Sequence, residues 1–199
     1  MKAFLAGAVA LSTLAAAVPA SADDISLGIP GYGGSGCPGG SVSTTLSPDG
    51  KSLSLIFDEY TVSAGGSTGR SFDRKTCNVA IPVHVPSGYS IAVLSVDYRG
   101  FNQLPPRAMS QFNVEYFFAG SRGPAFRRSF YGALQSDFFI NNLLGVESWV
   151  WSPCGAAVNL RTNSSMRLNT FNNAEAMASV DSQDVNAAIV YRLQMRRCS

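Results

Sequence analysis

Residues 187–195 read Ala-Ala-Ile-Val-Tyr-Arg-Leu-Gln-Met, and their alternation is the clearest structural signal in the chain. Every second residue from Ala187 to Met195 is apolar, whereas Arg192, Gln194 and Arg196 have the opposite parity. Successive side chains of a β-strand point to opposite faces of the sheet. The pattern therefore predicts a strand with one buried and one solvated face.

Residues 156–168 repeat this pattern, with Leu160 and Met166 on the apolar parity and Arg161 and Arg167 on the polar one. Eight shorter segments are also predicted strands: Ser41–Leu46, Leu53–Phe57, Tyr60–Ser63, Cys77–Val85, Tyr89–Tyr98, Gln111–Phe118, Phe126–Tyr131 and Val146–Trp151. The sequence Ser-Pro-Asp-Gly at residues 47–50 predicts a turn between the first two of these.

About ten short strands separated by Gly, Pro and Asn turns predict an all-β fold, an antiparallel β-sandwich or jelly-roll-like single domain with few or no helices. The one helix candidate is Leu134–Leu144. Residues 28–40 contain seven glycines and two prolines, so we expect no regular element there. The domain is expected to span residues 23–199, with residues 23–40 as a Gly-rich N-terminal segment.

The first 22 residues have the organisation of a secretory signal peptide. Lys2 gives a positive start, Ala3–Val18 is mostly apolar, and Ser21-Ala22 completes a small-residue cleavage site before two aspartates. Loss of Lys2 with this segment leaves a formal charge of +1 from the +2 of the whole chain. No second long apolar segment follows, so we expect a soluble secreted protein without a membrane span.

The composition excludes several classes of protein. Charged residues make up 14% of the chain, and 15 Lys and Arg balance 13 Asp and Glu. A nucleic-acid binder needs a basic stripe that this balance does not suggest. A single histidine cannot build a multi-histidine metal centre. We therefore expect no nucleic-acid partner, no metal and no cofactor.

Four cysteines, Cys37, Cys77, Cys154 and Cys198, lie beyond the expected cleavage point. An even number of cysteines in a secreted chain favours disulfides over metal ligation or catalysis. Three connectivities are open. We prefer Cys37–Cys77 with Cys154–Cys198, because each pair closes a loop of about 40 residues and ties down an end of the chain.

Two motifs resemble those of enzymes but lack the required context. Residues 31–36 match G-x-G-x-x-G, yet neither a strand before nor a helix after them is predicted. Residues 65–69 match G-x-S-x-G, and Ser67 with His84 would form an esterase-like pair. The surrounding residues predict a flexible loop, and a lone histidine is more often structural than catalytic.

Carboxylates offer a second catalytic hypothesis. Glycosidases need two of them about 5 Å or about 6.5–9.5 Å apart. The candidates are Asp58, Glu59, Asp97, Glu115, Asp137 and Glu147. Asp97 and Arg99 lie at the end of the most apolar predicted strand and are candidate ligand contacts, although an Asp–Arg pair that closes a turn is the simpler interpretation.

Trp149 and Trp151 share one parity and would form a sugar-stacking platform if exposed, or part of the core if buried. The interleaved basic and aromatic residues of 126–131 are explained by a strand with one packed face. Asn163 begins the sequon Asn-Ser-Ser and is a candidate glycosylation site in a eukaryotic source.

Several short segments together resemble the small secreted proteins of fungi and bacteria grouped as domain of unknown function 4360. These segments are Gly34–Pro38, Phe57–Tyr60, Asp73–Cys77, Asp97–Gly100, Trp151–Gly155 and Asn163–Leu168. The resemblance implies a secreted one-domain β protein. It assigns no activity and no catalytic residues.

We therefore expect a secreted, non-enzymatic β-sandwich whose loops contact an extracellular protein or polysaccharide of a cell wall, matrix or host. One alternative is a secreted hydrolase, either carbohydrate-active through a carboxylate pair or esterase-like through Ser67 and His84. A second alternative is a proteinase inhibitor that presents the loop Gly65–Arg70.

Overall fold

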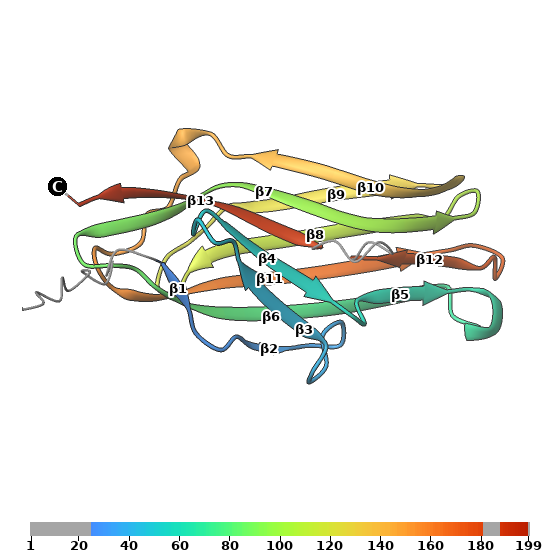
Figure 1. The fold of residues 1–199 in the computed structure, drawn as a ribbon. Helices are drawn as coiled ribbons and strands as arrows, with labels where there is room; N and C mark the ends of the chain where they lie inside the picture. The colour runs from blue at the N-terminus through green and yellow to red at the C-terminus, as the bar shows by residue number, and fades with distance from the viewer. Residues whose placement is uncertain (1–24, 181–187, 199) are drawn as a thin grey trace, which may run out of the picture.

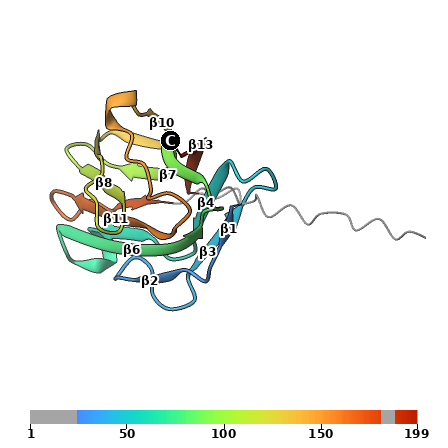
Figure 2. The ribbon, with the colours of Figure 1, turned by 90° about the vertical axis from the view of Figure 1, so that its left-hand side faces the viewer.

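Two antiparallel β-sheets pack face to face in the computed structural model, which describes residues 25–180 and 188–198 (Figure 1). Figure 2 looks along the strands and separates the two layers, with β6, β8 and β11 in one and β3, β4 and β13 in the other. The predicted β-sandwich is thus confirmed. The predicted signal peptide, residues 1–22, lies outside the described residues.

The first sheet, sheet A, has six strands. Its main order is β1-β6-β11-β8-β9, and β2 also pairs with β6. The bounds are β1 Ser26–Leu27, β2 Gly31–Gly33, β6 Phe72–His84, β8 Met109–Phe118, β9 Ala125–Tyr131 and β11 Ala157–Asn169. All 13 residues of β11 pair with β6 in one unbroken register, so β6 and β11 form the centre of this sheet.

The second sheet, sheet B, is built on the 16-residue strand β7. Strand β10 pairs with one edge of β7, while β13 and β12 share the other edge one after the other. The bounds are β3 Val42–Leu46, β4 Ser52–Phe57, β5 Thr61–Ala64, β7 Tyr89–Leu104, β10 Leu134–Leu143, β12 Ala176–Ser179 and β13 Ile189–Arg197. Two 3₁₀ turns, η1 (Gly66–Thr68) and η2 (Val146–Ser148), connect strands.

The helix predicted for Leu134–Leu144 is wrong, because residues 134–143 form strand β10 along β7. Leu134 and Phe138 point inward at a spacing of four residues, which suits both a helix and a strand. The long strand β7 offers ten pairing positions on this edge, and that tertiary partner decides between the two.

Three other local predictions also fail. The strand predicted for Val146–Trp151 is instead the 3₁₀ turn η2, followed by one isolated bridge between Trp151 and Ala92. The Gly-rich segment contains strand β2, since Gly31–Gly33 pairs with β6. Strand β12 was not predicted, because its four residues are too few for a period to show.

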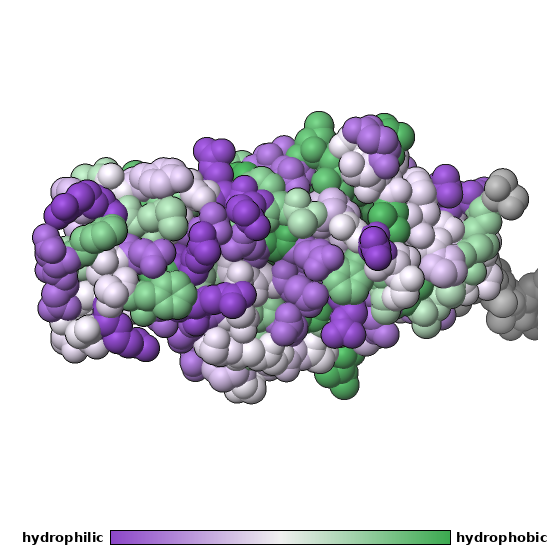
Figure 3. All heavy atoms as spheres, turned by 180° about the vertical axis from the view of Figure 1, so that it is seen from behind, coloured by the Kyte–Doolittle hydropathy of each residue, from purple (hydrophilic) through white to green (hydrophobic). Residues whose placement is uncertain are grey.

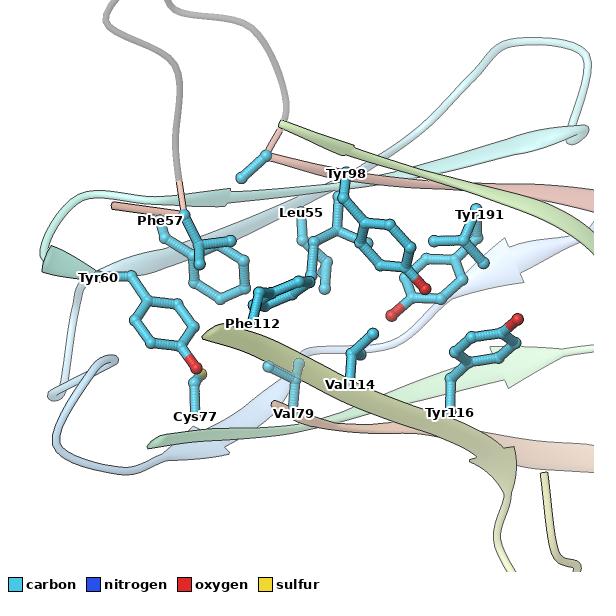
Figure 4. Packing of buried hydrophobic residues seen from close by; sticks show 14 of the residues in the cluster. Leu55, Phe57, Tyr60, Cys77, Val79, Tyr98, Phe112, Val114, Tyr116 and Tyr191 are labelled. Carbon is cyan, nitrogen blue, oxygen red and sulfur yellow. The ribbon is translucent and has the colours of Figure 1, made fainter. Parts of the chain in front are cut away.

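The interior between the sheets is rich in tyrosine. Figure 4 shows Tyr98 and Tyr191 descending from sheet B toward Phe112, Val114 and Tyr116 of sheet A. Tyr98 packs edge-on against Phe112, with ring centroids 5.4 Å apart. Tyrosine carries a hydroxyl into this apolar layer, so each ring needs a polar partner.

Three of the four fully buried tyrosines find such a partner. Tyr60 shares a hydrogen bond with the Ser164 hydroxyl, and Tyr191 shares one with Thr162. Both bonds join the two sheets across the core. Asn142 donates to the Tyr116 hydroxyl at 3.4 Å. The Tyr98 hydroxyl has no hydrogen-bond partner among the described residues. An unsatisfied buried hydroxyl costs about 1–3 kcal/mol.

The structure contains the two preferred disulfides, Cys37–Cys77 and Cys154–Cys198. The first is fully buried and fastens the segment after β2 to β6. Gly34 allows this close approach, because a Cβ there would overlap the Thr76 carbonyl oxygen. The second joins the end of β13 to the loop before β11. On the loop-entropy model each stabilises the fold by about 4 kcal/mol.

The buried tyrosines predict that the protein unfolds sharply in alkali. Burial raises the pKa of the Tyr60, Tyr98, Tyr116 and Tyr191 hydroxyls above their ordinary value. Above about pH 10 the unfolded chain loses these protons while the folded chain keeps them. The free energy of unfolding should therefore fall by about 1.4 kcal/mol per tyrosine for each pH unit. Denaturant titrations across this range, with phenolate absorbance, measure the slope.

Tyr98→Phe provides the matched control. It removes one proton from the alkaline slope and also removes the unpartnered hydroxyl, so stability at neutral pH should rise by about 1 kcal/mol. A variant that is less stable at neutral pH would contradict this account of Tyr98.

Candidate functional site

The outward side of sheet A carries mostly polar side chains, with a few apolar ones among them. Alternation places one side chain in two of each strand toward solvent. We call the following set the polar face: Phe72, Arg74, Thr76 and Asn78 of β6; Asn163, Ser165, Arg167 and Asn169 of β11; Met109, Gln111, Asn113 and Glu115 of β8; and Ala125, Arg127, Ser129 and Tyr131 of β9. Figure 3 looks onto this side, where hydrophilic residues spread across the strands.

The strand register arranges the polar face in rows. One row contains Arg74, Arg167, Gln111 and Ser129, which lie directly opposite one another on four adjacent strands. Gln111 donates to the Ser129 hydroxyl at 2.8 Å. In the next row, Arg127 donates from Nε to the side-chain amide oxygen Oδ1 of Asn113 at 2.8 Å. These lateral bonds hold the longer side chains in place.

An open hollow of about 640 Å³ lies over the middle of the polar face. Amides and hydroxyls line it together with two arginines, and its lining includes Arg74, Thr76, Asn78, Asn113, Arg127 and Asn163. Glu115 is the carboxylate in the lining. Such a surface offers many hydrogen-bond donors and acceptors to a ligand that is itself covered with hydroxyls.

The polar face is positively charged although the whole chain is nearly neutral. Its charged residues are Arg74, Arg127 and Arg167 against Glu115, and Arg161 projects outward beside it on β11. In the described part of the chain the ion pairs are Arg70–Asp73 and Arg192–Asp97, so none involves these four arginines.

Exposed aromatic rings border the polar face where β6 begins and β9 ends. Tyr131 is 68% exposed and Phe171 is 56% exposed. Together with Met109 and Arg107 they line a second hollow of about 610 Å³. The Arg107 guanidinium lies 5.8 Å from the centre of the Phe171 ring. Flat exposed rings at the edge of an amide-rich surface suit stacking against sugar rings.

Asn163, in the middle of β11, lines the hollow of about 640 Å³ over the polar face, which we call the polar hollow. Its neighbours across the sheet are Asn78 and Glu115. The sequon residue Ser165 accepts a hydrogen bond from the Asn113 amide at 3.4 Å. The candidate glycosylation site therefore coincides with the polar face.

Ser67 and His84 lie at opposite ends of β6. Ser67 belongs to η1, which precedes the first residue of β6, and His84 is the last residue of that 13-residue strand. At about 3.3 Å per residue, β6 separates them by about 40 Å. The two side chains therefore cannot form the hydrogen-bonded pair that an esterase mechanism requires.

The candidate carboxylates are dispersed over the molecule. Asp58 and Glu59 are exposed between β4 and β5, and Glu147 is exposed in η2. Glu115 lies on the outer side of sheet A, whereas Asp97 and Asp137 lie on the outer side of sheet B. Asp137 faces Phe101, four residues along β7 from Asp97, which corresponds to about 13 Å. This separation exceeds the range of a glycosidase pair. Among the described residues no cluster of three or more acidic, cysteine or histidine side chains could hold a metal ion.

Asp97 is engaged by two neighbouring strands. Arg192 of β13 contacts one carboxylate oxygen at 3.0 Å, and Asn141 of β10 donates to the other at 2.5 Å. The residue lies in the middle of β7 and not at a turn, so the proposed Asp–Arg turn pair is wrong. Arg99 instead lies over the Phe139 ring, 5.0 Å from its centre.

The two tryptophans are both half-buried. They meet edge to face, with ring centroids 6.1 Å apart. Trp149 packs against the core and donates its indole N–H to the Leu144 carbonyl. The Arg196 guanidinium covers the Trp151 ring at 3.9 Å. Because one ring is packed and the other is covered, we centre the candidate site on the polar face.

The sequence predicted the parity of β11 but not the rest of this site. Arg74 and Thr76 lie in the part of β6 that was not predicted to be a strand. Tyr131 and Arg127 were attributed to ordinary strand alternation. The site would be recognised only from the strand order. The outward polar residues of β6, β11, β8 and β9 form one surface because these four strands are neighbours in one sheet.

The fold and the disulfides are typical of extracellular β-sandwich proteins in which disulfides fasten both ends of the chain to the sheets. Residues 23–198 match the family described as domain of unknown function 4360, and the chain belongs to that family. It is also 33% identical over 170 residues to an uncharacterized secreted protein of Arthroderma benhamiae, covering 84% of this chain and 69% of that protein. The protein is secreted, in agreement with its disulfides. Within the described residues, no helix has the length and hydropathy needed to cross a membrane.

The engagement of Asp97 predicts a stabilising role. Its side chain is 4% exposed while that of Arg192 is 52% exposed, so solvent screens the pair in part. We expect Asp97→Asn to lower the free energy of unfolding by about 1–2 kcal/mol. Asp137→Asn, on the exposed side of β10, is the matched control and should change it by less than about 0.5 kcal/mol. Equal effects in urea titrations would contradict this prediction.

Proposed function

We propose that the protein is a secreted, non-enzymatic binding protein that contacts an extracellular polysaccharide through the polar face. The observation that carries this proposal is the arrangement in rows of polar and arginine side chains over four adjacent strands, beside exposed aromatic rings. Among the described residues, the arginines of these rows form no ion pair. For a secreted protein, the polysaccharides of a cell wall or an extracellular matrix are such ligands.

The dimensions of the polar face suit a chain-like ligand. From Tyr131 to Ala125, strand β9 extends for about 20 Å along the face. The hollow lined by Tyr131 and the hollow lined by Arg127 lie along this one path. A polymer could therefore stack one ring at the aromatic end and place its hydroxyls against the amides of Asn113 and Asn163.

Rigidity also supports a binding role. The side chains of the polar face project from paired strands and not from long loops, so little conformational entropy is lost when they meet a ligand. The buried disulfide Cys37–Cys77 holds β6 from the inner side of the sheet.

Residues 1–22 serve as the signal peptide, which agrees with a family match that begins at residue 23. Asn163 is a glycosylation site in a eukaryotic host, and a glycan there would extend from the floor of the polar hollow. The hydrolase alternatives have no support from the positions of Ser67 and His84 or of the carboxylates.

Co-sedimentation of the secreted chain with insoluble chitin, β-glucan, cellulose and pectate tests the proposal. We expect binding to at least one polymer, and Tyr131→Ala should weaken it about fivefold through loss of a stacking ring worth about 1 kcal/mol. Phe139→Ala is the matched control, because Phe139 is similarly exposed but lies on sheet B.

Two results would contradict the proposal. One is absence of binding to every polymer by a protein that melts cooperatively. The other is an equal loss of affinity in the Tyr131 and Phe139 variants, which would separate binding from the polar face.

A further inference from the structure

We propose that Arg74 and Arg167 form a subsite for the anionic groups of an acidic polysaccharide. This inference rests on the proposed function and specifies the ligand class of the same face. The proposed function covers neutral and acidic polysaccharides alike, and this inference specifies that the ligand is acidic.

Arg74 and Arg167 lie directly opposite each other on β6 and β11. Side chains in such positions have Cβ atoms about 4.5–5.5 Å apart, and like charges placed there destabilise a sheet. The positions that follow across the sheet are Gln111 and Ser129, which carry no charge. Neither arginine has an ion pair in the described chain.

The environment of Arg167 adds a second cost. Its Nε atom is buried and has no hydrogen-bond partner among the described residues. A buried guanidinium N–H without a hydrogen-bond partner is unfavourable in the free protein. Arg99 on sheet B has the same feature, and what distinguishes Arg167 is the second arginine directly opposite it. Two arginines in facing positions without an ion-pair partner become favourable once an oxyanion binds between their guanidinium groups, because arginine forms paired, charge-assisted hydrogen bonds to such groups.

The position of the pair points to a polymer. The row of Arg74 and Arg167 lies between the row of Phe72, Asn169, Met109 and Tyr131 at the aromatic end and the row of Thr76, Ser165, Asn113 and Arg127. A sugar chain stacked on the aromatic end and directed along the strands must cross the arginine row. Carboxylate or sulfate groups on that chain would then meet both guanidinium groups.

Soluble polygalacturonate tests the inference against its fully methyl-esterified form, which has the same backbone without the charge. We expect the secreted full chain to bind the acid at least about tenfold more tightly, since one charge-assisted hydrogen bond accounts for such a factor. Dextran sulfate, with neutral dextran as its reference, reports whether sulfate replaces carboxylate.

The double variant Arg74→Gln/Arg167→Gln should reduce binding of the acidic polymer to the level of the esterified one. Lys51→Gln/Arg128→Gln removes the same net charge away from the polar face, from the β3–β4 turn and from the other side of β9, and should retain most of the affinity. Since Arg74→Gln relieves the repulsion, it should also raise the melting temperature of the free protein while it lowers affinity.

The outcomes separate the two proposals. Equal affinity for charged and esterified polymers, or equal loss in both double variants, overturns the arginine subsite and leaves polysaccharide binding intact. Absence of binding to acidic and neutral polymers alike overturns the proposed function itself.

Discussion

The unbroken pairing of β6 with β11 is the constraint on which the rest of the structure depends. Thirteen residue pairs share one register, so the apolar parity of both strands faces the core and the polar parity faces solvent. A slip by one residue would exchange the two faces and bury Arg74 and Asn163. The register is held from the inner side, because Tyr60 bonds Ser164 of β11 and Cys37 is bonded to Cys77 of β6. Interior contacts thus determine where the outward side chains lie.

The two outer faces of the sandwich satisfy their polar groups differently. On sheet B, Asp97 accepts hydrogen bonds from strands on both sides of β7, and Arg99 covers Phe139. These contacts stabilise the sheet itself. On sheet A, Arg74 and Arg167 lie opposite each other and neither forms an ion pair with a described carboxylate, an arrangement that destabilises the sheet. Proteins tolerate such local costs where a ligand offsets them. The facing arginines of sheet A, which have no ion pair among the described residues, are the reason for placing the function on that sheet.

Much of the fold could be predicted from the sequence, because a strand buried on one side has a visible period. Residues 157–169 and 189–197 are examples, and the cysteine spacing indicated both disulfides. Residues 134–143 could not be assigned, since their apolar spacing of four fits two structures and only the partner β7 selects the strand. The candidate site was out of reach for a related reason. Its residues come from four strands up to 97 positions apart, from Phe72 to Asn169, and strand order is a tertiary property.

Asn163 connects the chemistry of the polar face to the cell that produces the protein. In a eukaryotic host a sequon is recognised on the nascent chain, before β11 acquires neighbours, whereas the hollow exists only after folding. Two preparations with the same sequence and the same fold could therefore present different surfaces, one an open arginine and amide face and the other a face shielded by its own oligosaccharide. The host cell that produces the protein would then decide whether the polar face is open to a ligand.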